Sequence, residues 1–353
     1  MRVHNKRHRL ATLGIASLTV LSAMSAAAVA TAQTAESFFK TNNKITLGAP
    51  SNAGGGYDTY TRLVARHITK YLPEGSSIVV QNVPAAGGMA LANMVYNTAP
   101  KDGTYLGMVR GTTIQEHIYA NPAVMFDGRK FQWIGNMNSD YDGCIVAAST
   151  GMTSVADFYK REVVVGASGA GAQSYSFPII YNEILGTKFK VISGYAGTPE
   201  RFLAMERGEL HGACGITTST LRATLAQPYR EGKILLLAQG GGKKDPHFPD
   251  VPNMLDEAKT AEARQALDFM LGTQELGRAF AAAPQTPLDR VAYLRGVFDR
   301  TIKDSDLLED AKKLQLDIDP MDGAASAAVI DRMYVTPAAI VERLRAALAR
   351  KQG

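Results

Sequence analysis

One stretch near the N-terminus constrains the fold more than any other. Residues 44–62 read as a short strand, a glycine-rich turn and the start of a helix. Apolar residues recur at helical spacing from Tyr60 onward. The turn contains three consecutive glycines: Gly54, Gly55 and Gly56. A helix that starts after such a turn has free backbone N–H groups, which together with the helix dipole attract an anion. The turn therefore predicts one wall of an anion site.

The first turn does not match the motifs that bind phosphate. A Walker loop ends in Gly-Lys-Ser/Thr, whereas Tyr57 and Asp58 follow Gly56 here. The three glycines also lack the G-x-G-x-x-G spacing of a dinucleotide fingerprint. Asp58 argues against a phosphate ligand, and it is placed to cap the helix or to order the turn. A tight strand-to-helix connection without any ligand is the alternative interpretation.

The same layout of strand, small-residue turn and helix recurs along the chain. An apolar strand at residues 78–80 precedes a second turn, which contains Ala85, Ala86, Gly87 and Gly88. A third strand at residues 105–109 is followed by Arg110, Thr112 and Thr113. Alternating strands and helices predict a parallel sheet, and ligands bind beyond the carboxyl ends of the strands in such sheets. We therefore expect the three loops at one rim of the sheet.

The middle of the chain predicts a second sheet with an anion-binding wall of its own. Its strands are read at residues 144–148, 163–166 and 234–238, with a polar crossover at 136–142 and a return linker at 240–246. The loop after residues 163–165 supplies small and polar ligand candidates: Ser168, Gly169, Gly171, Ala172 and Gln173. Thr198 and Pro199 start another helix, in which we expect Thr198 to act mainly as the N-cap.

Residues 1–32 are interpreted as a secretory signal peptide. Basic residues precede an apolar stretch, and small residues indicate cleavage near Ala30 or Ala32. The leader carries four basic residues and no acid, so the formal net charge of +5 for the full chain drops to +1 without it. The remaining Lys and Arg are scattered, which argues against nucleic-acid binding. We expect an exported, periplasmic protein.

Cysteine and histidine usage leaves one question open and argues against a metal. Cys144 and Cys214 both lie in apolar, strand-like contexts, and in an exported protein a disulfide and buried free thiols are both possible. The histidines beyond the leader lack the spacing of metal ligands: His67, His117, His211 and His247. We therefore expect no metal and no other cofactor.

Three motifs in this order resemble the solute receptors of tripartite tricarboxylate transporters, the Bug receptors. They are Ala-Gly-Gly-Gly-Tyr-Asp-x-x-x-Arg at 53–62, Val-Gln-Asn-Val-Pro-Ala-Ala-Gly-Gly at 80–88 and Ala-Pro-Lys-Asp-Gly-Thr-Tyr at 99–105. The resemblance continues with a glycine-rich loop at 166–171, Gly-Tyr-Ala-Gly at 194–197, Gly-Glu-Leu-His at 208–211 and Phe-Pro-Asp-Val-Pro at 248–252. It covers most of the chain, from about residue 44 to residue 313.

The resemblance implies an α/β fold of the type II-like, two-lobed periplasmic binding protein class. Each lobe is expected to be a mainly parallel sheet flanked by helices, with the ligand in the cleft between the lobes. The first lobe would comprise residues 33–137 plus 245–353, and the second lobe residues 138–244. The implied function is to bind a small organic carboxylate, either a di- or tricarboxylate or an aromatic acid, and to deliver it to membrane transporter subunits. The protein would be a monomer and not an enzyme.

The predicted ligand-binding residues lie in the loops that face the cleft. They are Gly54, Gly55, Gly56, Tyr57, Asp58, Ala85, Ala86, Gly87, Gly88, Thr112, Thr113, Ser168, Gly169, Gly171, Ala172, Gln173, Tyr195 and His211. Three positions depart from the family pattern: His211 stands where Asp is usual, Ala196 where Lys is usual, and Tyr57 where a small residue is common. Tyr57 and Tyr195 would flank an aromatic acid or hydrogen-bond an aliphatic one.

Two other functions remain as alternatives. An exported sensor partner would bind the same ligand but dock on a signalling protein. An exported hydrolase is less favoured, because the chain has no G-x-S-x-G elbow and its few histidines do not flank a nucleophile in sequence.

Overall fold

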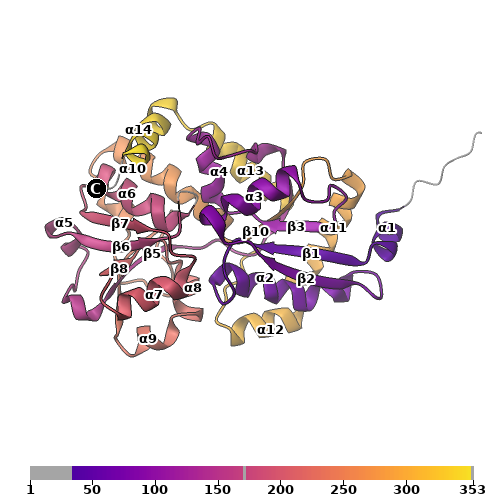
Figure 1. The fold of residues 1–353 in the computed structure, drawn as a ribbon, viewed down its shortest axis with the longest axis horizontal. Coiled ribbons are helices and arrows are strands. Elements are labelled where there is room, and N and C mark those ends of the chain that lie inside the picture. The colour runs from indigo at the N-terminus through magenta and orange to yellow at the C-terminus, as the bar shows by residue number, and fades with distance from the viewer. Residues whose placement is uncertain (1–33, 170–171, 351–353) are drawn as a thin grey trace, which may run out of the picture. The chain divides into compact units, whose positions relative to one another are not determined.

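The computed structural model describes residues 34–169 and 172–350. Two β-sheets, each covered by helices, account for its architecture (Figure 1). By their internal contacts, the residues Ala35–Gly353 form one unit, apart from Met1–Thr34. The predicted signal peptide and its cleavage sites lie outside the described residues.

The first sheet has six strands in the order β11-β4-β10-β3-β1-β2. They are β1 (Lys44–Ala49), β2 (Ser77–Asn82), β3 (Tyr105–Met108), β4 (Gln132–Asn136), β10 (Ala279–Ala282) and β11 (Met321–Asp322). Strand β1 pairs in parallel with β2 and β3, and the other three pairings are antiparallel. The three strand-to-turn units predicted from the sequence are therefore neighbours, with β1 in the middle.

The second sheet has five strands in the order β7-β6-β8-β5-β9. They are β5 (Asp142–Ala147), β6 (Val163–Ala167), β7 (Phe189–Ser193), β8 (Gly212–Ala213) and β9 (Ile234–Gly240). Strand β6 is parallel to β7 and β8, whereas β5 is antiparallel to β8 and β9. Both sheets are thus mixed, which differs from the expected mainly parallel arrangement. The reason is that the chain crosses from one sheet to the other before β5 and again before β10. Each of these strands therefore begins at the edge of its sheet where neighbouring strands end, and runs antiparallel to them.

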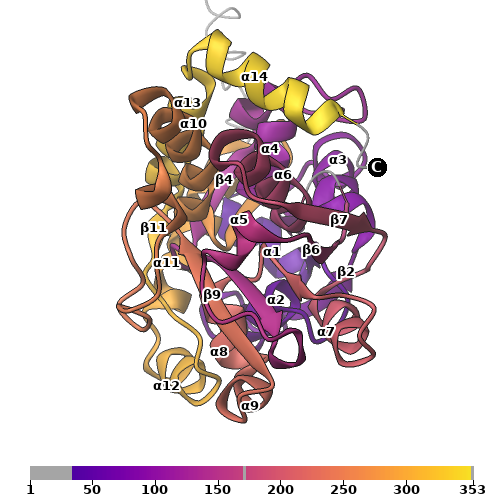
Figure 2. The same ribbon diagram turned by 90° about the vertical axis from the view of Figure 1, so that its left-hand side faces the viewer.

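Fourteen α-helices surround the two sheets in the described part of the chain. They are α1 (Ala35–Thr41), α2 (Gly56–His67), α3 (Met89–Asn97), α4 (Gly111–Ile118), α5 (Asp157–Lys160), α6 (Gln173–Leu185), α7 (Thr198–Glu206), α8 (Thr218–Ala223), α9 (Ala226–Arg230), α10 (Ala261–Leu271), α11 (Leu288–Ile302), α12 (Ser305–Lys313), α13 (Gly323–Tyr334) and α14 (Ala338–Ala349). Helices α10 and α14 follow the return linker in sequence but pack against α6 of the second sheet (Figure 2). The exact lobe boundaries stay a prediction.

The core lies along the central strands. Strands β3, β5 and β10 are buried over their whole length. A disulfide joins Cys144 in β5 to Cys214, the residue after β8, which settles the alternative that the sequence left open. In the chain-entropy account, a cross-link that closes a loop of 70 residues stabilises the native state by about 4 kcal/mol.

Candidate ligand-binding site

The buried side chain of Asp58 orders the turn between β1 and α2. Its carboxylate accepts hydrogen bonds from the backbone N–H of Gly54, from Nε of Arg62 and from Nδ2 of Asn82, at 2.9, 2.9 and 2.8 Å. Burial alone would raise the pKa of Asp58, but these hydrogen bonds outweigh it, and the net pKa is lowered. Asp58 therefore orders the turn as an anion.

This arrangement leaves two backbone N–H groups free at the start of α2. The N–H groups of Gly54 and Gly55 are used within the turn. Those of Gly56 and Tyr57 donate no hydrogen bond to any residue that the structure describes. Both residues line a small cavity between the two sheets. The helix start thus offers donors to an anion, as the glycine-rich turn predicts.

The second turn, Ala85–Gly88, lies beside the second sheet and makes room for an arginine. A Cβ atom on Gly169 would lie 3.4 Å from the backbone nitrogen of Gly87, so the two loops are in contact. Gly88 has a φ of +101°, and a Cβ atom there would lie 3.0 Å from Nε of Arg110. The missing side chain lets Arg110 pass alongside the turn.

Arg110 reaches the cavity from the end of β3, where it is the N-cap residue of α4. Its Nη2 donates to the carbonyl oxygen of Pro50 at 2.6 Å, and its guanidinium carbon lies 4.1 Å from the centroid of the Tyr57 ring. Its buried Nε has no hydrogen-bond partner in the part of the chain that the structure describes. Burial lowers the pKa of Arg110, and the charge of Arg278 acts in the same direction. Arg110 is therefore a partly buried cation whose Nε remains available as a donor.

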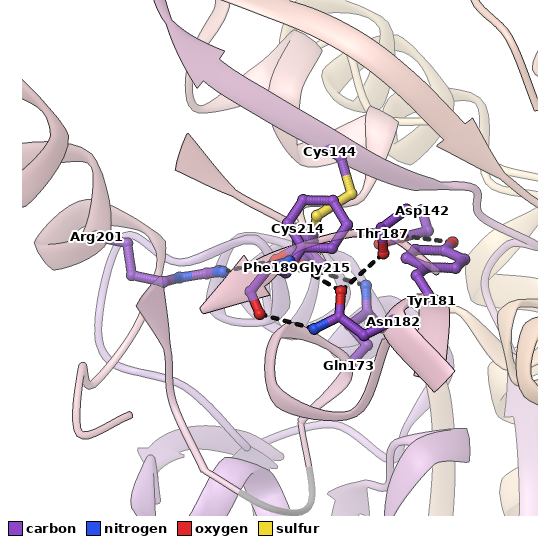
Figure 3. Close-up of a disulfide and its surroundings, with 10 residues drawn as sticks. All are labelled: Asp142, Cys144, Gln173, Tyr181, Asn182, Thr187, Phe189, Arg201, Cys214 and Gly215. Atoms are coloured by element: carbon purple, nitrogen blue, oxygen red, sulfur yellow. Dashed lines mark hydrogen bonds between the residues drawn. A yellow bond between two sulfur atoms is a disulfide. The ribbon is translucent and has the colours of Figure 1, made fainter. Parts of the chain in front are cut away.

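Arg201 reaches the same cavity from α7 and is buried. Its guanidinium donates to the carbonyl oxygens of Cys214 and Gly197, at 3.1 and 3.4 Å. It also donates to Oγ1 of Thr198 at 3.2 Å. The disulfide between Cys144 and Cys214 ties this acceptor loop to β5 (Figure 3). The orientation of Arg201 therefore depends on a cross-linked loop.

The charges of Arg110 and Arg201 are only partly neutralised. Burial lowers the pKa of Arg201 to about 10, and repulsion from Arg110 contributes in the same direction. Asp142 and Glu200 offset only part of this effect. Burial raises the pKa of Asp142 well above its ordinary value, which reduces its negative charge, and Tyr181 donates to it at 3.2 Å (Figure 3). Two guanidinium groups therefore bring excess positive charge to one cavity.

Arg278, next to β10, is by contrast paired with a carboxylate, although its buried Nε has no hydrogen-bond partner among the described residues. Its side chain is fully buried and forms an ion pair with Asp140 at 3.2 Å. Its Nη2 also donates to Oγ1 of Thr217 and to Oγ of Ser219, at 3.2 and 3.3 Å. Burial alone would lower the pKa of Arg278, but Asp140 together with Tyr57, Tyr60 and Asp317 outweighs it, and the net pKa is raised. The guanidinium carbon lies 4.4 Å from the centroid of the Tyr57 ring, so that ring contacts two arginines.

The cavity has a volume of about 40 Å³ and lies between elements of both sheets. Its lining residues are Ser51, Gly55, Gly56, Tyr57, Arg110, Ser168, Gln173, Ser174, Gly197, Thr198, Arg201, Gly215, Thr217 and Thr220. These described lining residues include two arginines, several hydroxyl groups and no carboxylate. Such a set of donors fits an anion.

Five of the predicted ligand residues line this cavity: Gly55, Gly56, Tyr57, Ser168 and Gln173. Others support it from close by: Gly54 and Asp58 in the first turn, the second turn of Ala85, Ala86, Gly87 and Gly88, Gly169 against that turn, and Ala172 as the N-cap of α6. Thr112 and Thr113 are buried in the first turn of α4, where Thr113 donates to the carbonyl oxygen of Arg110. Gly171 lies outside the described residues.

The structure places Tyr195 and His211 away from the cavity lining. Tyr195 donates its backbone N–H to Ala167, and its ring packs beside Gly166. His211 Nδ1 accepts a hydrogen bond from the backbone N–H of Val164 at 3.1 Å, within the second sheet. A direct part in ligand binding for these two side chains stays a prediction.

Sequence reasoning missed the residues that carry the positive charge. Arg110 was placed on the rim, but only its neighbours were named as ligands, and nothing in the sequence around Arg201 marks it as buried. Thr198 was expected to cap α7, whereas the N-cap is Gly197, and Thr198 instead accepts from Arg201 and lines the cavity. In the sequence, the hydroxyl group of Thr198, which can accept a hydrogen bond, was the signal for its place in the cavity.

Membrane and metal features are limited in the part of the chain that the structure describes. No single helix there is long and apolar enough to cross a membrane, and α13 and α14 meet the length and composition only jointly, as a pair bent by 85°. No group of three or more His, Cys, Asp or Glu in those residues is arranged to hold a metal ion.

Two helix-covered sheets with a polar cavity between them form the fold of the two-lobed periplasmic binding proteins. Residues 60–305 match the family model described as tripartite tricarboxylate transporter family receptor, and the match spans more than half of the chain. The chain therefore belongs to this family of receptors. A Cupriavidus necator protein named UPF0065 protein in gbd 5'region is 26% identical over 260 residues, which cover 70% of this chain and 73% of that protein.

Solved structures share the fold at low sequence identity. MatC from Rhodopseudomonas palustris, solved with bound malate, is 20% identical with a TM-score of 0.68, over 86% of this chain and 98% of that chain. The periplasmic binding protein BugD is 19% identical with a TM-score of 0.68, over 86% and 97%. A further R. palustris protein, solved with adipate, is 17% identical with a TM-score of 0.65, over 85% and 97%. These likenesses confirm the predicted fold class.

Proposed function

We propose that this protein is a periplasmic receptor for a small organic carboxylate, a di- or tricarboxylate or an aromatic acid. It would deliver the ligand to the membrane subunits of a tripartite tricarboxylate-type transporter. The observation that carries the proposal is the pair of guanidinium groups, Arg110 and Arg201, that line one cavity with no carboxylate among its described lining residues. The free N–H groups of Gly56 and Tyr57 supply further donors at the same place.

The ligand class follows from the charge of the lining. A carboxylate would relieve the repulsion between Arg110 and Arg201 and would accept charge-assisted hydrogen bonds, which are stronger than neutral ones. Family membership and the fold shared with proteins solved with malate and adipate support an organic acid over an inorganic anion. Both arginines contact parts of the protein that keep them in place, so little ordering is required on binding.

Binding requires the two walls of the cavity to separate first. A volume of about 40 Å³ holds only about three waters, and ordinary ligand pockets measure roughly 300–1,000 Å³. The lining comes from loops of both sheets, so movement of one sheet unit relative to the other would widen it. Closure around the ligand would then exclude water from the arginines.

The first test is a thermal-shift screen of the protein without its leader against malate, adipate, citrate and benzoate. A ligand at about 100 times its dissociation constant stabilises the folded state by about 2.7 kcal/mol. Recovery of the ligand unchanged after incubation would separate a receptor from a hydrolase. If none of these acids, nor a wider panel of carboxylates, raised the melting temperature, the proposed function would be wrong.

The second test removes each cavity cation in turn. Arg110→Met and Arg201→Met keep the aliphatic bulk but delete a donor to a charged acceptor, a change worth about 1.5–3 kcal/mol, or roughly 10- to 150-fold in affinity. Arg207→Met is the matched control, because Arg207 follows α7 but is exposed and paired with Glu209. Unchanged affinity in both cavity variants would contradict the role of the arginines.

A further inference from the structure

A second cavity, of about 490 Å³, lies where the end of α4, the start of α6 and helix α14 meet. It shares no lining residue with the cavity between the sheets. Its polar wall contains Glu116 and the two tyrosines Tyr119 and Tyr175, and its apolar wall includes Pro122 and Leu348. The size is that of an ordinary small-molecule pocket.

Glu116 is a buried carboxylate without a cation. Its side chain is 5% exposed, and one oxygen accepts a hydrogen bond from Nδ2 of Asn121 at 2.6 Å. Among the described residues it forms no ion pair. Arg345 is the one cation in the described lining, and it pairs with Glu342 at 2.7 Å instead. Buried carboxylates are rarely left without a counter-charge, because the desolvation cost is large.

Two aromatic residues flank this carboxylate. Tyr119 is 4% exposed, its buried hydroxyl has no hydrogen-bond partner among the described residues, and its ring meets that of Phe269 edge-on at 6.0 Å. Tyr175, from α6, lines the cavity with it, and the charge of Glu116 acts on both phenols. Aromatic rings beside a carboxylate are surroundings that suit an ammonium group, which is attracted to both.

The backbone between these groups is held in an uncommon conformation. Ala120 lines the cavity with a φ of +56°, which is unfavourable for a residue with a side chain. This turn brings Asn121 back to the helix end, where its N–H donates to the carbonyl oxygen of Glu116 at 3.0 Å and its side chain holds the carboxylate. Strained turns that fix a polar group occur at ligand sites more than elsewhere.

We propose that this cavity binds a small organic ammonium ion. The ammonium charge pairs with the Glu116 carboxylate between Tyr119 and Tyr175, and the alkyl part packs against Pro122 and Leu348. The site is distinct from the carboxylate site and does not depend on it.

The titration of Glu116 gives the site a pH dependence. Burial raises the pKa of Glu116 to about 7, and the hydrogen bond from Asn121 offsets only part of this shift. Among the described residues, the other ionisable groups that line the cavity are Tyr119, Tyr175, Glu342 and Arg345. Because a cation pairs only with the ionised carboxylate, ammonium binding should weaken by about tenfold or more between about pH 8 and pH 5.5.

The test is calorimetric titration of the full mature chain with choline and with n-butylammonium. The neutral isostere 3,3-dimethylbutan-1-ol controls for the apolar contribution. We expect at least one of the two cations to bind in the millimolar range or better at about pH 8, and the alcohol to bind at least about tenfold more weakly. Glu116→Gln should lose about tenfold or more in affinity, whereas Glu309→Gln, which removes an exposed carboxylate on α12 outside this lining, should stay within about twofold.

Several results would overturn this proposal. They are no detectable binding of either cation, equal binding of the alcohol, or unchanged affinity in Glu116→Gln. If that variant fails to fold, the pH dependence and the alcohol control in the unaltered protein still decide the matter. The two proposals can fail separately. If no carboxylate binds, the proposed receptor function is wrong, whereas the second site is judged by ammonium binding alone. The arginine variants should lose carboxylate binding and still bind the ammonium ion.

Discussion

Replacement of Glu116 by Gln offers a direct measurement of what a buried, unpaired carboxylate costs this fold. The variant keeps the shape of the side chain and an oxygen that accepts from Asn121, but it removes the ionisable group. Glu116 has a pKa of about 7 in the folded protein against an ordinary value of 4.5, because burial disfavours the charged form. The folded state therefore holds its proton more tightly than the unfolded state.

The sign and size of the effect follow from this difference. Below about pH 4.5 Glu116 is protonated in both states and costs nothing. As the pH rises, the unfolded chain loses its proton first, so the stability of the native state falls until the pH passes the folded pKa of about 7. The shift from 4.5 to about 7 corresponds to about 3 kcal/mol.

Urea unfolding, followed by circular dichroism at several values from about pH 4.5 to pH 8, measures this cost. Other titrating groups are common to both proteins and cancel in the difference. We expect Glu116→Gln to gain about 3 kcal/mol over the unaltered protein between the two ends of this range. A difference in unfolding free energy that stays constant with pH would refute the argument that Glu116 is buried without a counter-charge.

Three further predictions concern the cavity between the sheets. Gly56→Ala would place a Cβ atom 2.3 Å from Oγ1 of Thr220 on the opposite wall, so we expect weaker carboxylate binding in calorimetry with a nearly unchanged melting temperature. Replacing Cys144 and Cys214 together by Ala should lower the free energy of unfolding by about 2–5 kcal/mol and also weaken carboxylate binding. A loss of stability alone, with unaltered affinity, would show that the cross-link does not position the site. Asp58→Ala should weaken carboxylate binding in a folded protein by loosening the first turn, and an unchanged dissociation constant would contradict this role.

The sequence predicted best where local chemistry decides the backbone. Consecutive glycines can only form a turn, and the helical spacing that starts at Tyr60 gives α2, whose buried side includes Tyr60, Leu63 and Val64. The rule that ligands bind beyond the carboxyl ends of parallel strands then placed the first turn at the cavity. These inferences need only neighbouring residues and general sheet geometry.

Long-range arrangement was harder to predict, because it depends on which segments meet. The guanidinium of Arg201 is buried and donates to the carbonyl oxygen of Cys214, which is 13 residues away in the sequence. The composition of a helix does not reveal such a partner, and neither does the position of a single cysteine. The antiparallel direction of β5 and β10 was not predicted for the same reason, since it depends on where the chain passes between the two sheets.

Hydrogen bonds from Arg278, beside β10, to Thr217 and Ser219 have a consequence for the resting balance of the receptor. They connect residues beside the two sheets without a bound ligand. The protein's own hydrogen bonds therefore stabilise a closed conformation. A receptor with this bias binds its ligand more tightly, because less of the binding free energy is needed to close the two walls of the cavity. The same bias reduces the difference between the ligand-free and the ligand-bound conformation.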